Sequence, residues 1–207
     1  MPRRRSALAP LLALPLLAAC AQSTETVAGL AGTESAAPAL GRALSPDRAL
    51  ASLPREAGAV VSVVERRSTT GVTQTITLAG DPGSRGDDRI EVSTRERARN
   101  TPRPSVDQEV IEAEMAEAIP GVAMTMSPRV VTTASGPVGI ATGRAADGNA
   151  CLYAWSQSET RMRGTTTTLL GLTIERPPLA DLSVRVRLCR RGVSEERLIA
   201  FAEGLTL

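Results

Sequence analysis

The first twenty residues decide which part of this chain folds and in which compartment it does so. Arg3, Arg4 and Arg5 form a basic start, and an apolar run follows from Ala7 to Ala19. The run is too short for a membrane-spanning helix but has the length of the apolar part of a secretory signal peptide. We therefore expect residues 1–19 to be removed and the remaining chain to fold outside the cytoplasm.

The end of this run indicates a lipid anchor. Residues 17–20 read Leu-Ala-Ala-Cys, which resembles the lipobox of bacterial lipoproteins: small residues fit the peptidase groove, and the cysteine thiol takes the diacylglycerol. The alternative is an ordinary signal peptide whose cysteine is incidental. We expect Cys20 to be the acylated first residue of the mature protein. Because Ala21 rather than aspartate follows it, outer-membrane sorting is the expected default, with the protein facing the periplasm.

Two missing residue types exclude most common catalytic mechanisms. The chain has no histidine, and all of its basic residues are arginines. Histidine-dependent triads, histidine metal ligands, Schiff bases and Walker-type phosphate loops are thereby excluded. Removal of the three leader arginines leaves 24 − 3 = 21 basic against 22 acidic residues. With no basic stripe left, we expect no nucleic-acid partner, and we expect no metal, cofactor or catalytic residue.

Two cysteines remain once Cys20 is acylated. Cys151 and Cys189 are an even pair in an oxidising compartment, so we predict a disulfide between them. The chain-entropy model gives about 4 kcal/mol for a loop of this length. Two buried free thiols are the alternative.

The chain divides into a leader, a tether and one domain. Residues 20–57 are rich in Ala, Ser, Thr, Gly and Pro without a sustained period, so we predict a disordered, lipidated tether that reaches roughly 30–35 Å. Residues 58–207 are predicted to form a single domain. β-Branched or alternating residues predict strands over 59–67, 72–79, 89–97, 122–126, 150–157, 165–175 and 182–189, and the glycines of 136–143 predict a turn with close strand packing. The charges of 89–97 suggest a protected edge strand.

Two helices complete the predicted domain. Ser105 and Gln108 form a capping box for a helix that runs to Ile119, and Ser194 caps a helix over 195–203. The resulting order predicts an α+β fold in two layers, with both helices on one face of a mainly antiparallel sheet. The first helix carries four acids that read as a solvated face, with a carboxylate cluster for metal or acid–base chemistry as the alternative: Glu109, Glu112, Glu114 and Glu117.

The cysteine pair also predicts a strand register. If 150–157 and 182–189 are antiparallel neighbours with Cys151 opposite Cys189, then Tyr153 faces Arg187 and Trp155 faces Arg185. Cation–π contacts of this kind contribute about 0.5–1 kcal/mol at exposed sites. Exposed, these four residues could stack on and hydrogen-bond to a sugar or contact a partner. The competing interpretation, which we favour, is that residues 158–181 or the tether cover them.

Several short motifs resemble one known family. Cys-Leu-Tyr-Ala-Trp at 151–155 is similar to the cellulose biosynthesis protein BcsN family, small envelope proteins of alphaproteobacteria. Further similar motifs occur in the same order, namely 64–67 with 74–76, 120–124, 136–143 and 185–189. One departure is Ile140, where the family pattern has an aromatic residue. The resemblance implies a role in cellulose production or export and implies no catalytic residues.

The leading hypothesis is a non-enzymatic outer-membrane lipoprotein that assists cellulose synthesis or secretion as an adaptor or scaffold. Its expected partners are the lipid bilayer and subunits of the cellulose synthase or secretion complex. The second hypothesis is a glucan-binding module that uses Tyr153 and Trp155. A carboxylate-based hydrolase is the third, and no pair of acids at the required spacing stands out for it.

Overall fold

Strands with alternating apolar residues make up most of the structure. The computed structural model describes residues 41–80, 88–98, 101–102, 106–133, 135–161, 166–169, 172–175 and 179–207. The strands are β1 (Arg42–Leu44), β2 (Val60–Arg67), β3 (Gly71–Leu78), β4 (Asp88–Glu96), β5 (Met124–Met126), β6 (Val131–Thr133), β7 (Gly136–Arg144), β8 (Ala150–Arg161), β9 (Thr166–Leu169), β10 (Leu172–Glu175) and β11 (Leu179–Arg190). The helices are α1 (Gln108–Ala118) and α2 (Glu195–Glu203), with short 3-10 turns η1 (Pro46–Arg48) and η2 (Arg55–Ala57).

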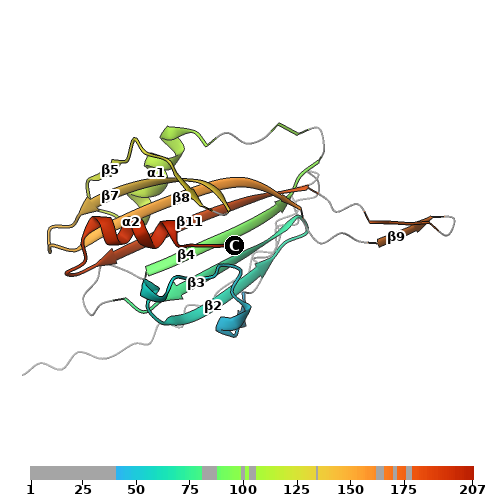
Figure 1. Cartoon of the computed structure of the whole chain (residues 1–207), viewed down its shortest axis with the longest axis horizontal. Coiled ribbons are helices and arrows are strands. Elements are labelled where there is room, and N and C mark those ends of the chain that lie inside the picture. The colour runs from blue at the N-terminus through green and yellow to red at the C-terminus, as the bar shows by residue number, and fades with distance from the viewer. Residues whose placement is uncertain are drawn as a thin grey trace, which may run out of the picture. The chain divides into compact units, whose positions relative to one another are not determined.

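Nine of these strands form one antiparallel sheet. Its order is β1-β2-β3-β4-β11-β8-β7, and β5 and β6 both pair with β7 (Figure 1). β9 and β10 form a separate hairpin where the sequence predicted a single strand. β4 lies between β3 and β11, so the prediction of an edge strand over 89–97 is wrong. The strand becomes central because β11, from the far end of the chain, pairs with its open side.

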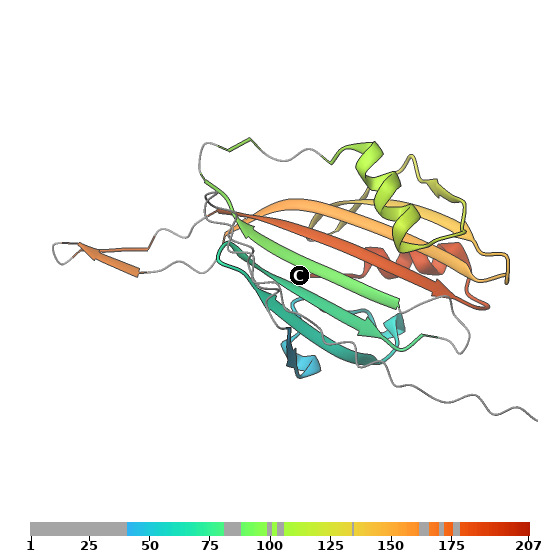
Figure 2. The same ribbon diagram turned by 180° about the vertical axis from the view of Figure 1, so that it is seen from behind.

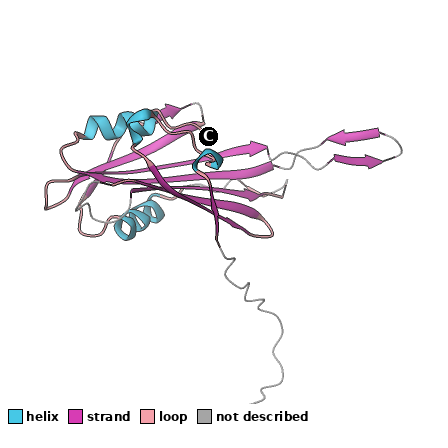
Figure 3. Ribbon diagram, turned by 90° about the horizontal axis from the view of Figure 1, so that it is seen from below, coloured by secondary structure: helices cyan, strands magenta, loops and turns pink. Residues whose placement is uncertain are grey.

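The two helices pack on opposite faces of this sheet. On one face α2 packs against β8 and β7, and Leu152, Val186 and Phe201 lie in the core on that side. On the other face α1 covers parts of β8 and β11, with Met115 and Tyr153 in a second core. Figure 1 shows α2 in front of the sheet, and Figure 2, which is seen from behind, shows α1 in front of it. Figure 3 shows helices on both sides of the strands. The α+β class and the mainly antiparallel sheet are confirmed, but the placement of both helices on one face is wrong.

The start of α1 differs from the predicted capping box. Asp107 is the N-cap residue, and its side chain accepts a hydrogen bond from the Glu109 amide at 3.0 Å. A carboxylate at this position also interacts favourably with the helix dipole. Ser105, the predicted cap, lies outside the described residues. Val110, in the first turn of α1, is 53% exposed.

α2 begins and ends where the sequence predicts. The Ser194 hydroxyl accepts a hydrogen bond from the Arg197 amide at 3.4 Å, and Gly204 follows the last helical residue. Neither helix, nor any other in the described part of the chain, is long and apolar enough to cross a membrane.

Residues 41–57 belong to the folded domain. β1 adds to the sheet beside β2, and Ala51 and Ala57 are buried. The buried side-chain amide of Gln74 holds the middle of this segment: its oxygen accepts from the Leu50 amide at 2.8 Å, and its nitrogen donates to the Arg48 carbonyl at 3.2 Å. The prediction of a tether reaching residue 57 is therefore wrong for 41–57. Residues 20–40, including the predicted acylation site, lie outside the described residues.

Candidate functional site

The α1 face of β8 and β11 brings the predicted site residues together. Cys151 lies opposite Cys189, Tyr153 opposite Arg187 and Trp155 opposite Arg185. This is the register that the cysteine pair predicted, and it is confirmed. Because alternate residues of a strand point to the same face, all three pairs lie under or beside α1.

The predicted disulfide between Cys151 and Cys189 is present. Both cysteines are buried in the core beneath α1, where they pack with residues such as Ile111 and Ile119. The bond joins two residues that the pairing of β8 and β11 already places opposite each other. The cover over the sulfur atoms is apolar, and the structure therefore fits a structural disulfide rather than a reactive thiol pair.

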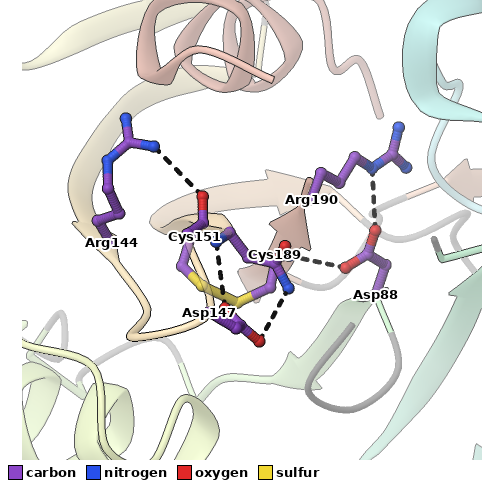
Figure 4. The surroundings of a disulfide bond; sticks show 8 residues. Asp88, Arg144, Asp147, Cys151, Cys189 and Arg190 are labelled. Carbon is purple, nitrogen blue, oxygen red and sulfur yellow. Dashed lines mark hydrogen bonds and ion pairs between the residues drawn. A yellow bond between two sulfur atoms is a disulfide. The ribbon is translucent and has the colours of Figure 1, made fainter. Parts of the chain in front are cut away.

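A buried aspartate links the disulfide to the N-terminal segment. The Asp88 carboxylate is 1% exposed and accepts hydrogen bonds from the Cys189 amide at 2.8 Å and from Arg190 Nε at 2.9 Å (Figure 4). The same guanidinium donates to the Glu56 carbonyl at 3.1 Å and to the Ala57 carbonyl. Residues next to the disulfide thus fix η2 against the end of β11.

Tyr153 and Trp155 do not form an exposed platform. Tyr153 is 4% exposed, and its ring lies 6.2 Å from the ring of Trp155 at a tilt of 32°. The half-buried Trp155 lies against Gly139, where a Cβ atom would come within 2.2 Å of the indole. The cover over Tyr153 comes from α1, which packs on its ring and binds its hydroxyl through Glu114. The hypothesis of a sugar-stacking pair is wrong for Tyr153, which has no open ring face.

Glu114 on α1, which was predicted to lie on a solvated face, is the centre of a polar network. Its carboxylate accepts from Arg185 Nε at 2.5 Å, from Arg185 Nη2 at 3.3 Å and from the Tyr153 hydroxyl at 2.9 Å. Arg185 also donates to the Ser183 hydroxyl at 2.9 Å. The guanidinium that was expected to stack on Trp155 therefore binds a carboxylate, because a bidentate ion pair is stronger than a cation–π contact at such a site.

The electrostatics of this network favour an ionised Glu114 and a neutral Tyr153. Hydrogen bonds from Arg185, with a further one from Tyr153, lower the pKa of Glu114 despite the opposing effect of partial burial. Burial, and then the hydrogen bond to Glu114, raise the pKa of Tyr153. Glu114 is therefore a carboxylate and Tyr153 a neutral phenol at neutral pH. A general acid needs the opposite shift, so this arrangement suits holding α1 in place rather than transferring a proton.

The sequence carried a usable indication of this role for Glu114. Ile111 and Met115 are buried, and position 114 lies three residues after the first and next to the second. Residues three and four apart share a helix face, so Glu114 borders the buried stripe. Its charge led to its assignment to the solvated face, while the arginine that receives it lies far along the chain.

Open space remains beside this network. A pocket of about 420 Å³ lies between α1 and the strands β4 and β11, and a second of about 430 Å³ continues over β3 and β4. Arg187, one of the predicted contact residues, lines the first pocket. Within the described residues no three acids or cysteines are grouped so that they could hold a metal ion.

Comparison with known proteins gives one match. Residues 51–207 match the model of a family described as cellulose biosynthesis protein BcsN. No curated protein and no solved structure shows significant similarity to the chain.

Proposed function

The chain belongs to the cellulose biosynthesis protein BcsN family and takes part in cellulose biosynthesis, and on that premise we propose that it is a non-enzymatic lipoprotein of the outer membrane. It faces the periplasm and assists cellulose synthesis or secretion as an adaptor between components of that machinery. Its partners are the lipid bilayer, through Cys20, and subunits of the cellulose synthase or secretion complex.

The observation that supports a periplasmic location is the buried disulfide. Stable disulfides form in oxidising compartments such as the periplasm and are rare in the cytosol. Cys151 and Cys189 come together across two neighbouring strands, which leaves Cys20 as the remaining cysteine. Its position after a signal-like run supports acylation as the use of that third thiol.

The state of Glu114 supports a binding role over catalysis. Glu114 forms a bidentate ion pair with Arg185, and its pKa is lowered. It is therefore unsuited to protonate a glycosidic oxygen, which is the first requirement of a carboxylate hydrolase.

A genetic and biochemical experiment tests the proposal. In a cellulose-producing host that lacks this gene, the wild-type chain should restore cellulose, and in vivo crosslinking should join it to cellulose synthase or secretion subunits. The Cys20→Ala variant should leave the outer-membrane fraction of a density gradient and restore less cellulose. Full restoration by that variant, or crosslinks to no subunit of the machinery, would count against an anchored adaptor. Release of reducing sugar from cellulose by the purified protein would contradict the non-enzymatic assignment.

A further inference from the structure

The central strand β4 carries an unusual row of polar side chains. On the α1 face it presents Arg89, Glu91, Ser93 and Arg95, of which the two arginines are exposed and the other two half-buried. The sequence explanation for these charges was protection of a sheet edge, and that explanation fails because β4 is paired on both sides. The charges therefore need another cause.

These four side chains are not engaged by the rest of the domain. Within the part of the chain that the structure describes, none of them forms a side-chain hydrogen bond or ion pair. The neighbouring row on β11 differs: Asp181 pairs with Arg97 at 3.4 Å, and Ser183 and Arg185 bind each other. The groups of β11 hold the fold together, and those of β4 point into open space.

That space is a trough that runs along β4. The two pockets described above share Glu91 and Ser183 as lining residues, so they adjoin. Residues of one strand that share a face lie roughly 7 Å apart, so the row from Arg89 to Arg95 extends over roughly 20 Å. An elongated trough of this length suits an extended chain better than a compact small molecule.

The chemistry of the trough favours a neutral ligand rich in hydroxyl groups. The charged lining residues balance, because four arginines (Arg89, Arg95, Arg185 and Arg187) stand against four acids (Glu91, Glu114, Glu117 and Asp181). An anionic or cationic polymer would meet no net opposite charge here. Donors and acceptors alternate along the row, and a sugar hydroxyl can both donate and accept. The aromatic ring in the lining, Tyr153, is covered, so binding would depend on hydrogen bonds rather than stacking.

We propose that this trough binds a single β-1,4-glucan chain along β4, as the polymer that the adaptor handles. The proposal rests on the role in cellulose biosynthesis stated above and names a ligand and a site for it. The glucan site is thus displaced from the Tyr153–Trp155 pair of the sequence hypothesis to the open row on the neighbouring part of the same face.

Calorimetric titration of the purified full chain in mild detergent tests the proposal. Cellohexaose should bind, and cellobiose should bind at least tenfold more weakly because it spans fewer residues of the row. The double variant Arg89→Ala/Glu91→Gln should weaken cellohexaose binding at least tenfold. Glu109→Gln is the matched control, since Glu109 is an exposed acid of α1 outside the trough, and it should change the affinity less than twofold. Thermal unfolding of each variant checks that the fold is intact.

Three results would overturn the glucan site. They are no binding heat with cellohexaose up to millimolar concentration, equal binding of maltohexaose or oligogalacturonate, or unchanged affinity in a folded double variant. These outcomes are separable from failure of the adaptor role. A double variant that still crosslinks to the synthesis machinery and restores cellulose, while the wild type binds no glucan, would reject the trough and leave the adaptor standing.

Discussion

Removal of the disulfide should destabilise the domain strongly. We consider the double variant Cys151→Ala/Cys189→Ala, because alanine avoids placing hydroxyl groups in the apolar core beneath α1. The bond closes a loop with a sequence separation of 38, and the chain-entropy model assigns about 4 kcal/mol to a loop of that length. For a domain of about 150 residues, this corresponds to a decrease in Tm of about 8–16 °C.

Burial of the disulfide leads to a second expectation, which concerns its reduction. Both sulfur atoms are buried, so a reductant should reach the bond only when the domain opens. Wild-type protein should resist reduction in the native state. After it is unfolded, reduced and refolded, it should unfold at a urea concentration close to that of the double variant. The reduced wild type keeps both sulfur atoms, so any difference between it and the variant measures their packing alone.

Urea and thermal denaturation followed by circular dichroism give the required free energies. Cys20→Ala serves as the control and should leave Tm unchanged. A loss of less than about 1 kcal/mol in the double variant would refute the loop-closure reasoning. So would a wild-type protein whose midpoint is the same before and after reduction.

Three further variants test separate parts of the structure. Glu114→Gln should lower the free energy of unfolding at pH 7 by about 1–2 kcal/mol after solvent screening. Because the folded-state pKa of Glu114 is lowered, its contribution to stability is present above the unfolded pKa and lost as pH falls, so the difference in unfolding free energy between wild type and variant should narrow in acid. An equal difference at pH 3 and pH 7 would contradict the ion pair. Gly139→Ala should cost about 1–3 kcal/mol and shift the emission of Trp155, since the added methyl would lie 2.2 Å from the indole; unchanged emission and stability would show that the strand and ring move apart freely. Gln74→Leu should speed hydrogen exchange of the Leu50 amide, which Gln74 binds at 2.8 Å, and unchanged protection of that amide would argue against the proposed anchoring of the segment.

The register of β8 and β11 was predictable because two local facts agreed. Each strand alternates clearly, and each carries one cysteine near an end, so placing the two cysteines opposite each other sets the partner of each remaining residue in both strands. The positions of Tyr153 and Arg185 followed from that alignment. A covalent constraint in the sequence therefore fixed a long-range contact that alternation alone leaves open.

The position of β4 was not predictable in the same way. Alternation identifies a strand but not its second neighbour, and the charges of Arg89 and Arg95 fit an edge strand equally well. The pairing with β11 joins residues from distant parts of the chain. Local sequence carries no information on such a contact unless a marker such as a disulfide supplies it.

The opposite placement of the helices did leave a trace in the sequence. Residues 150–154 are buried on both sides of β8, and a continuous apolar run of this kind indicates a strand covered on both faces. Residues 41–57, in contrast, form a three-residue strand and two single turns. Elements this short contain less than one full hydrophobic period, so composition suggested a tether.

The sheet face that α1 covers is apolar in one part and polar in another, and this difference explains why α1 covers the first part and leaves the trough open. α1 has 11 residues and is about 16 Å long, whereas neighbouring strands lie about 4.8 Å apart, so it cannot cover a sheet of this width. It lies where that face is apolar, over the disulfide and Tyr153, and Glu114 binds Arg185 at the border. Beyond that border the face is polar and uncovered. One ion pair thus fixes the wall of the trough, and Glu114→Gln should weaken cellohexaose binding along with stability, whereas Glu109→Gln should leave cellohexaose binding unchanged.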